Sequence, residues 1–223
     1  MIGLFLTGSH QALKNLANAV ALILVAPCAG MAAAEGRLGL DREAIFNFWT
    51  HVFALAPGLP GMYLRRAFYR LTLDDCAIDF FVGFGTIFTH RRARVEPGVY
   101  IGPYGLIGGA TLRRGCLIGS RVSIVSGRNL HELQPDGTWG PSRIETLQPL
   151  EIGEHCWIGE ASTVLANVGR GALVGAGSVV AAAVPAGVMV AGNPARFIRV
   201  LQPPARPAAP VEKIYAGRIR PGD

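Results

Sequence analysis

His131 is the residue of this sequence whose type and setting best suit proton transfer, and it is one of five histidines. It lies in the segment SGRNLHELQPDGTWGPSRIETLQP, which interrupts an otherwise regular repeat. A neutral imidazole titrates in the range that a general base needs. A loop histidine taken alone is more often a solvated side chain, so the case for His131 depends on the elements around it.

The other histidines and the cysteines give no sign of a metal centre. His90, in the turn THRR, is a second candidate for substrate contact, whereas we expect His155 to be a solvated residue of a repeat turn. The cysteines are Cys28, Cys76, Cys116 and Cys156. They are far apart, without a C-x-x-C pair or histidines at zinc spacing, so we expect packing roles and no metal.

The element that must position His131 is a repeat of six residues between about Ile78 and Val200. Its aliphatic column is Val95, Ile101, Ile107, Leu112, Ile118, Ile124, Ile152, Ile158, Val164, Val168, Val174 and Val180. A second column, two residues earlier, is Val99, Gly105, Cys116, Val122, Cys156, Ser162, Ala172 and Ser178. Two inward columns predict short extended segments stacked into a prism. The spacing slips after Ile107 and after Val164, and it does not set the handedness.

The run IGEHCWIGEASTVLANVGRGALVGAGSVVAAAVPAGVMVAGNPARFIR resembles the carboxy-terminal signature of the hexapeptide-repeat acyltransferases, most specifically at WIG, GAGSVV and AGNPAR. The resemblance covers about residues 78–200 and implies a mainly β fold, a left-handed parallel β-helix. We therefore expect an apolar helical region over 1–73, a β-helix over 74–200 with an excursion at about 126–149, and a Pro- and Ala-rich tail over 201–223.

The same resemblance implies an O-acyltransferase that moves an acetyl or other short acyl group from acetyl-CoA to a hydroxyl, without a metal. His131 would deprotonate the acceptor hydroxyl, and its imidazolium would then protonate the departing CoA thiolate. The backbone N–H of Glu160 would donate to the oxyanion. His90 and Arg128 are expected to contact the acceptor.

The resemblance also implies a cofactor groove between neighbouring prisms of a homotrimer. Its expected lining residues are Trp157, Gly159, Glu160, Ala176, Ala181, Asn193, Arg196 and Arg199. Arg196 and Arg199 would approach the cofactor phosphates, and Asn193 and Pro194 would shape the turn that aims them. The alternative is a carboxy-terminal lid over the helix axis, a role that can coexist with cofactor binding. Family members often carry threonine or serine where this chain has Ala181, so a side-chain hydrogen bond is not expected there.

Two other functions fit a prism of this kind. Zinc carbonic anhydrases need three histidines around the metal, and His90, His131 and His155 lack the close pair that those enzymes carry. A non-catalytic membrane assembly scaffold would not need His131. As acceptor we expect a surface-polysaccharide or lipid-linked sugar, although serine, antibiotics and free sugars are acceptors of the same core.

The amino-terminal region contains an uncharged segment, Ala19 to Ala34, interrupted by Pro27 and Gly30. A membrane span, a re-entrant or interfacial helix and a signal peptide all fit it. A second helix follows, REAIFNFWTHVFAL, with Asp41 as its expected cap.

A third apolar and basic stretch, MYLRRAFYR, comes next. Its arginines Arg65, Arg66 and Arg70 suit anionic headgroups, or else lie in water while the helix packs on the prism.

The formal net charge of +6 is nearly all arginine and favours anionic partners. Phosphates of a cofactor or a membrane surface fit better than nucleic acid, for which no binding motif is present. We expect attachment to the cytoplasmic face of the inner membrane, peripheral or anchored through the amino terminus, with a cytoplasmic location as the alternative.

Overall fold

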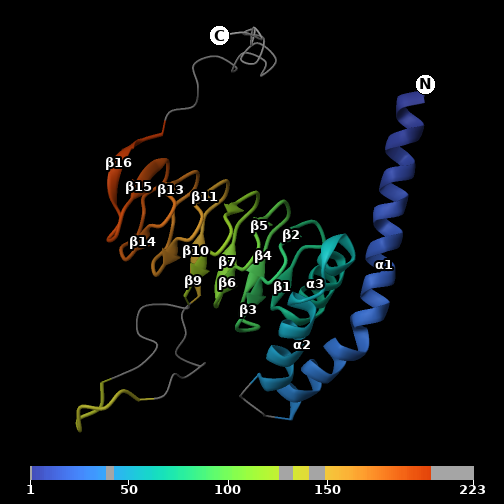
Figure 1. Cartoon of the computed structure of the whole chain (residues 1–223), viewed down its shortest axis with the longest axis horizontal. Helices are drawn as coiled ribbons and strands as arrows, with labels where there is room; N and C mark the ends of the chain where they lie inside the picture. Colours follow the sequence, from blue (N-terminus) through green and yellow to red (C-terminus); the bar gives the residue numbers. More distant parts are fainter. Residues whose placement is uncertain (1, 39–42, 126–132, 141–148, 202–223) are drawn as a thin grey trace, which may run out of the picture.

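A computed structural model describes residues 2–38, 43–125, 133–140 and 149–201, with the side chains of residues 2–10 and of Gly36 left out. His131 and Arg128 lie outside these described residues. Three helices come first in the chain, and sixteen short strands follow (Figure 1).

The strands stack into a parallel β-helix with three faces, in which each coil contributes to every face. Face A contains β1 (Asp75–Cys76), β4 (Arg94–Val95), β7 (Ala110–Leu112) and β10 (Leu150–Ile152). Face B contains β2 (Phe81–Val82), β5 (Tyr100–Ile101), β8 (Leu117–Ile118), β11 (Trp157–Ile158), β13 (Leu173–Val174), β15 (Val188–Ala191) and the antiparallel β16 (Arg196–Val200). Face C contains β3 (Ile87–Phe88), β6 (Leu106–Ile107), β9 (Ser123–Ile124), β12 (Thr163–Val164) and β14 (Val179–Val180).

Both predicted columns point inward and form the core. Every residue of the aliphatic column is at most 2% exposed, from Val95 to Val180. Cys116 and Cys156 of the small column are 0% exposed, which confirms their packing role. Burial raises the pKa of the Cys116 thiol to about 12. These side chains are therefore structural and not nucleophilic at neutral pH.

The slips in the repeat all fall at one edge of the prism, where face C turns into face A. We name this edge the CA corner. Ile107 and Leu112 face each other across it in one coil, and Val164 and Val168 do so in another. In these two coils the CA corner is shorter than the other two corners, so fewer residues separate the inward positions. The irregular spacing therefore means that the triangular cross-section of the prism is uneven.

Three helices cover the first coil. They are α1 (Ile2–Arg37), α2 (Ala44–Ala54) and α3 (Gly58–Thr72). Helices α2 and α3 pack on the strands of this coil, and α1 packs on α2 and α3. The expected interruption of the apolar segment is wrong, because α1 continues through Pro27 and Gly30. Its inner side packs over several turns through Ala21, Val25, Ala29 and Ala32, and this contact supports the helix across the proline.

The amino terminus of α2 is capped from α1. The carboxylate of Glu35 accepts hydrogen bonds from the backbone N–H groups of Ile45 and Phe46, at 2.9 and 3.3 Å. Glu43, the residue before α2, makes no side-chain cap, and the expected cap Asp41 lies outside the described residues. Arg91 of the first coil pairs with Glu35 at 3.1 Å. Glu35 thus ties both α2 and the β-helix to α1.

Both readings of the arginines in α3 are wrong for Arg65 and Arg66, which are 1% and 8% exposed. Arg65 donates to the carbonyls of Ala56 and Val82, at 2.6 and 3.3 Å. Arg66 donates to the carbonyl of Phe80. The first coil has no preceding strand to take its carbonyls, so these guanidinium groups close an edge that would otherwise be unpaired. Arg70 is exposed.

Candidate active site

Face B carries a row of outward apolar side chains that crosses six strands. The paired positions are Phe81, Tyr100, Leu117, Trp157, Leu173 and Met189. Tyr100, Leu117 and Trp157 are 42%, 48% and 55% exposed, and Phe81 stacks on Tyr100 with ring centroids 4.8 Å apart. We call this row the face B ladder. A ladder of this size is apolar enough to pack against another protein surface.

The ladder ends beside the predicted phosphate-binding residues. Arg199 pairs with Met189 across β16 and β15, so it continues the row that contains Trp157. Within the described part of the chain, neither Arg199 nor Arg196 contacts a carboxylate, and both are exposed. Arg196 donates only to the carbonyl of Ala195, at 3.2 Å. Two cations without a carboxylate partner among the described residues, next to an apolar row, form a surface that attracts an anion with an uncharged arm.

The turn from face B to face C, which we name the BC corner, presents a file of backbone N–H groups. Ser120, Glu160 and Ala176 occupy the same place in three successive coils. Among the described residues, no acceptor is found for the N–H of any of the three. Successive coils lie about 4.8 Å apart, so the N–H groups are spaced along a line. Such a file suits the amides of an extended ligand, or an oxyanion.

Glycine is required for this file because the coils approach closely. A methyl group on Gly159 would lie 2.5 Å from the nitrogen of Ala176 and 2.7 Å from the carbonyl oxygen of Val174. A methyl group on Gly119 would lie 2.8 Å from the nitrogen of Glu160. The Glu160 side chain points to solvent and reaches Arg121 at 3.6 Å. Only the backbone of Glu160 therefore belongs to the file.

The turn between β15 and β16 shapes the end of the site. Asn193 and Pro194 are joined by a cis peptide bond in this turn. Hydrogen bonds of 2.9 and 2.8 Å join Gly192 and Ala195 to Val179 of face C. This contact fixes where β16 begins, so Asn193 has the turn-forming role that was expected of it, while its cofactor contact stays a prediction.

The excursion leaves the prism at the CA corner, between Ile124 of β9 and Leu150 of β10. Its described part, residues 133–140, contains an antiparallel bridge between Leu133 and Trp139, and it lies clear of the stacked coils (Figure 1). Leu133 and Trp139 are 62% and 70% exposed. His131 lies next to this part but outside the described residues. The excursion therefore leaves from one edge of face C, and the N–H file lies along the other.

Ala181 and His90 also lie at the CA corner. Ala181 follows β14, which places it across face C from Ala176. His90 follows β3 in the first coil, where its Nδ1 lies 3.1 Å from Oε2 of Glu43. Burial alone would raise the pKa of the Glu43 carboxyl, but the hydrogen bonds to His90 and to the backbone of Arg91 lower it overall. In this chain His90 thus joins the helices to the first coil, and its contact with substrate stays a prediction.

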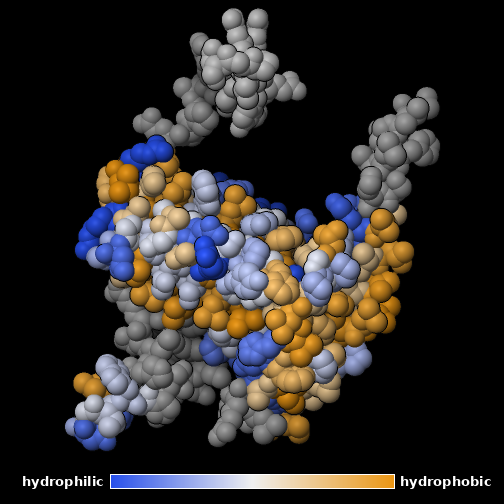
Figure 2. Space-filling model, viewed as in Figure 1, coloured by the Kyte–Doolittle hydropathy of each residue, from blue (hydrophilic) through white to orange (hydrophobic). Residues whose placement is uncertain are grey.

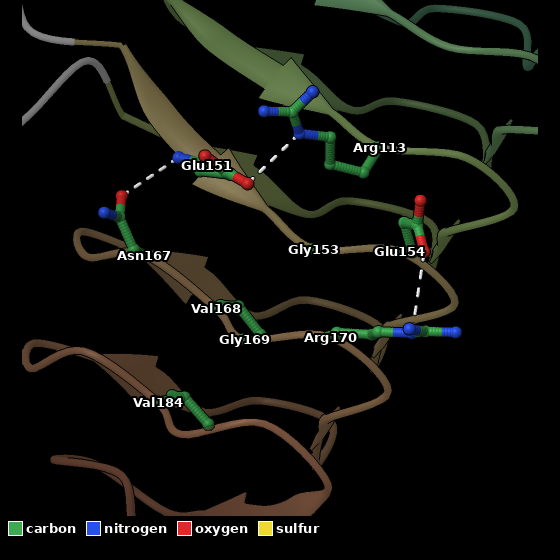
Figure 3. A pocket seen from close by; sticks show the side chains of 9 residues that line it. All are labelled: Arg113, Glu151, Gly153, Glu154, Asn167, Val168, Gly169, Arg170 and Val184. Carbon is green, nitrogen blue, oxygen red and sulfur yellow. Dashed lines mark hydrogen bonds and ion pairs between the residues drawn. The ribbon is translucent and has the colours of Figure 1, made fainter.

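A polar groove of about 400 Å³ lies on face A, and Figure 3 shows that its charges are matched. Arg113 bridges Glu96 and Glu151 at 2.9 and 3.1 Å. Arg170 lies 3.5 Å from Glu154. None of the predicted site residues lines this groove, so it is a separate feature of the surface.

Apart from Trp157, the outward ladder was missed from the sequence, and so was Ser120 as a member of the N–H file, although a signal for each was present. The residues of the ladder alternate with the inward column, so an apolar residue at those positions is exposed in a closed prism. Each member of the N–H file comes one residue after a glycine, at Gly119, Gly159 and Gly175. Neither signal can be interpreted until the faces are assigned.

Comparison with known proteins supports the repeat. The family model described as "Hexapeptide repeat of succinyl-transferase" matches residues 149–182. The chain is 33% identical over 124 residues to WbbJ of Escherichia coli K12, described as an O-acetyl transferase of lipopolysaccharide biosynthesis. That match covers 52% of this chain and 62% of WbbJ. Serine acetyltransferase 2 of Arabidopsis thaliana is 35% identical over 115 residues, covering 51% of this chain and 32% of that protein.

The chain thus spans less than two thirds of the length of these curated relatives. Among solved structures, a maltose O-acetyltransferase from Clostridium difficile 630 aligns with a TM-score of 0.56 at 18% identity, covering 77% of this chain and 91% of that one. A galactoside acetyltransferase in complex with coenzyme A aligns with a TM-score of 0.57 at 18% identity, covering 74% and 82%. These likenesses confirm the hexapeptide repeat and the left-handed parallel β-helix.

Proposed function

We propose that this hexapeptide-repeat protein is an acyl-CoA-dependent O-acyltransferase that transfers an acetyl group, or another short acyl group, to a saccharide hydroxyl. The observation that carries the proposal is the file of unpartnered N–H groups beside Trp157 and the free arginines of β16. The printed descriptions of the relatives, which include O-acetyl transfer and a coenzyme A complex, support the same reaction. Neither a carbonic anhydrase nor a scaffold is favoured by any of them.

The file supports a particular pose for the donor. The pantetheine arm, with its two amides, would run along the BC corner, where Ala176 offers an N–H and the apolar ladder flanks the chain. The phosphates would lie near Arg196 and Arg199. This pose leaves the thioester at Glu160, whose N–H would donate to the oxyanion of the tetrahedral intermediate.

His131 is the proposed base. Its imidazole would take the proton of the acceptor hydroxyl as the oxygen attacks the thioester carbon. Collapse of the intermediate breaks the carbon–sulfur bond, and the imidazolium returns the proton to the CoA thiolate. Arg128, three residues earlier in the sequence, would hold the acceptor.

A second copy is needed to complete the site. Within one chain, the excursion leaves at the CA corner, and the N–H file lies at the BC corner. A side of five residues separates them by about 16 Å. The described part of the excursion, residues 133–140, stands away from its own prism and exposes Leu133 and Trp139. We therefore propose a homotrimer in which the excursion of one copy reaches the ladder and file of the next.

The acceptor is proposed to be a sugar of a surface polysaccharide or of its lipid-linked precursor, since WbbJ is described in that context. One helix segment, Gln11–Glu35, is long and apolar enough to cross a membrane, with mean hydropathy 2.0, although core helices and signal sequences pass the same test. We propose that this region brings the enzyme to the cytoplasmic face of the inner membrane, where acyl-CoA is available.

The test is a screen of the full-length protein with acetyl-CoA, in which release of free thiol is followed in the presence of different glycans. We expect thiol release that depends on a saccharide acceptor and yields an ester. Release with serine instead would change the acceptor class. No release with any hydroxyl compound, from a protein that binds CoA, would contradict the proposed function.

A further inference from the structure

The outer side of α1 is an apolar surface at the end of the molecule. Large hydrophobic side chains with at least 45% exposure follow one another along it: Leu13, Leu16, Val20, Ile23, Leu24 and Met31. Figure 2 shows hydrophobic residues gathered along the described part of this helix. Isolated exposed leucines need no explanation, but a continuous stripe marks a surface that meets something apolar.

The inner side of α1 is fixed to the rest of the protein. Ala21, Val25, Ala29 and Ala32 are at most 5% exposed. Asn18 accepts a hydrogen bond from Arg66, and Glu35 holds the ion pair with Arg91. If α1 crossed a bilayer, these contacts would break or the first coil would enter hydrocarbon, where its polar backbone is costly. We therefore expect α1 to lie along a membrane surface with its contacts to the rest of the protein intact.

A groove of about 590 Å³ opens beside the stripe, between α1 and the start of α3. Its lining is apolar apart from Lys14 and the hydroxyl of Tyr63: Leu13, Leu16, Ala17, Val20, Ala21, Leu24, Leu59, Pro60 and Leu64 complete it. An apolar groove with one cation in its lining fits a hydrocarbon chain whose headgroup is anionic.

The charges around the surface indicate which occupant it takes. Within the described parts of α1, α2 and α3, the exposed charged side chains are Lys14, Arg37 and Arg70, all cationic. The carboxylates of Glu35 and Glu43 are 3% and 14% exposed and face Arg91 and His90. A second copy would meet the same positive charges, whereas an anionic bilayer would neutralise them.

We propose that α1 lies in the plane of an anionic phospholipid bilayer, with one lipid chain in the groove, and that the β-helix stands upright on this base. Figure 1 shows α1 crossing the end of the stack of coils, so the axis of the prism points away from the apolar surface. Glu160, just after the fourth strand of face B, then lies about 25 Å above the helical base.

The height of Glu160 above the bilayer narrows the choice of acceptor, and this inference rests on the proposed function. The hydroxyl that reacts must stand well above the bilayer, so the acceptor would be an extended lipid-linked glycan acetylated several sugars from its lipid. A sugar joined directly to the lipid phosphate would not reach the N–H file without removal from the membrane.

Vesicle sedimentation tests the docking with the full-length protein. We expect binding to vesicles of phosphatidylcholine mixed with phosphatidylglycerol, and weaker binding to phosphatidylcholine alone. Ile23→Glu combined with Leu24→Glu should weaken binding by roughly tenfold or more, because two exposed apolar side chains that would enter the bilayer become charged. Leu106→Glu, at a similarly apolar position on face C, is the matched control. Equal binding by the double variant and the control would overturn the proposal. It would also be overturned if the unmodified protein bound no vesicles and the double variant had a changed oligomeric state, because the surface would then contact a second copy.

Spin labels at Val20, Leu24 and Met31 test the orientation of α1. Each is introduced on one added cysteine with Cys28 replaced by serine, and the other native cysteines, Cys76, Cys116 and Cys156, are buried. We expect the three labels to lie at one depth. A spanning helix would separate the first and last by about 16 Å along the bilayer normal.

Energy transfer from a label at Ala183 to headgroup fluorophores should report about 35 Å for an upright prism. A value less than half of this would place the prism on its side and remove the inference about glycan length. No acetyl-CoA is present in these assays. A protein that docks without transferring acetyl groups would therefore contradict only the proposed function.

Discussion

At the scale of single residues, Gly159 is where the site and the fold constrain each other most. The coils at the BC corner are close enough that a methyl group there would meet backbone atoms of the next coil on two sides. The backbone of a stacked coil cannot move to relieve this contact, whereas the end of a flexible side chain could. The same approach that excludes a side chain sets the nitrogen of Ala176 beside that of Glu160.

We predict that Gly159→Ala will lower both stability and turnover. The added methyl group must push the coils apart and so displace the two N–H groups. The loss of unfolding free energy should be about 1–3 kcal/mol, as for an overpacked core. Urea denaturation and the acyltransferase assay measure the two effects. Gly30→Ala, where a methyl group meets nothing within 4 Å, is the control and should leave turnover unchanged. Normal activity of Gly159→Ala would separate the file from catalysis.

At the scale of elements, the joint between the helices and the β-helix depends on Glu35. This carboxylate accepts from two N–H groups of α2 and pairs with Arg91, although it is only 3% exposed. Removing one partner of a buried pair leaves an uncompensated charge on the other.

We predict that Glu35→Gln will lower the free energy of unfolding by about 3–5 kcal/mol. Glu154→Gln removes the partner of Arg170 at an exposed site and should cost at most about 1 kcal/mol. Chemical denaturation of both variants measures the difference. Equal losses would mean that the joint is held by apolar contacts and not by Glu35.

The C-terminal hairpin gives a second prediction at this scale. Arg196→Ala and Arg199→Ala should weaken acetyl-CoA binding, because both guanidinium groups are exposed and free to meet phosphates. The effect should shrink at high salt and for acetyl-pantetheine, which lacks the nucleotide. Titrations with the two donors measure it. Equal losses for both donors would assign the arginines a structural role.

The sequence predicts the β-helix well because its inward residues repeat, and twelve aliphatic positions from Val95 to Val180 could be placed without a structure. The arginines of α3 could not be placed. Their burial depends on open carbonyls of the first coil, which belong to another element. The ladder could not be predicted for a similar reason. The alternation of inward and outward residues does not tell which of the three faces a partner would cover. The role of His131 still rests on its place in the excursion.

At the scale of the whole molecule, the separation of the excursion from the N–H file makes assembly part of the proposed chemistry. Face A is polar and carries the ion pairs of Arg113 with Glu96 and Glu151, whereas face B presents the apolar ladder. A prism with one such face can bury it only against another surface.

We predict that Leu117→Asp will dissociate the trimer, because it places a charge in the middle of the ladder. Light scattering should change from three copies to one, and activity should be lost although the catalytic residues are intact. Thr111→Asp adds the same charge to face A and should leave the trimer whole. A fully active monomer would contradict the shared site.

The role of His131 as the base in acyl transfer is tested most directly by comparing turnover of His131→Ala and His90→Ala, with acetyl-CoA affinity measured for each. We predict that His131→Ala lowers turnover by roughly a hundredfold or more while acetyl-CoA affinity hardly changes. His90→Ala should lose far less, because that side chain joins Glu43 in the first coil. Near-normal turnover in a folded His131→Ala protein would show that His131 is not the base.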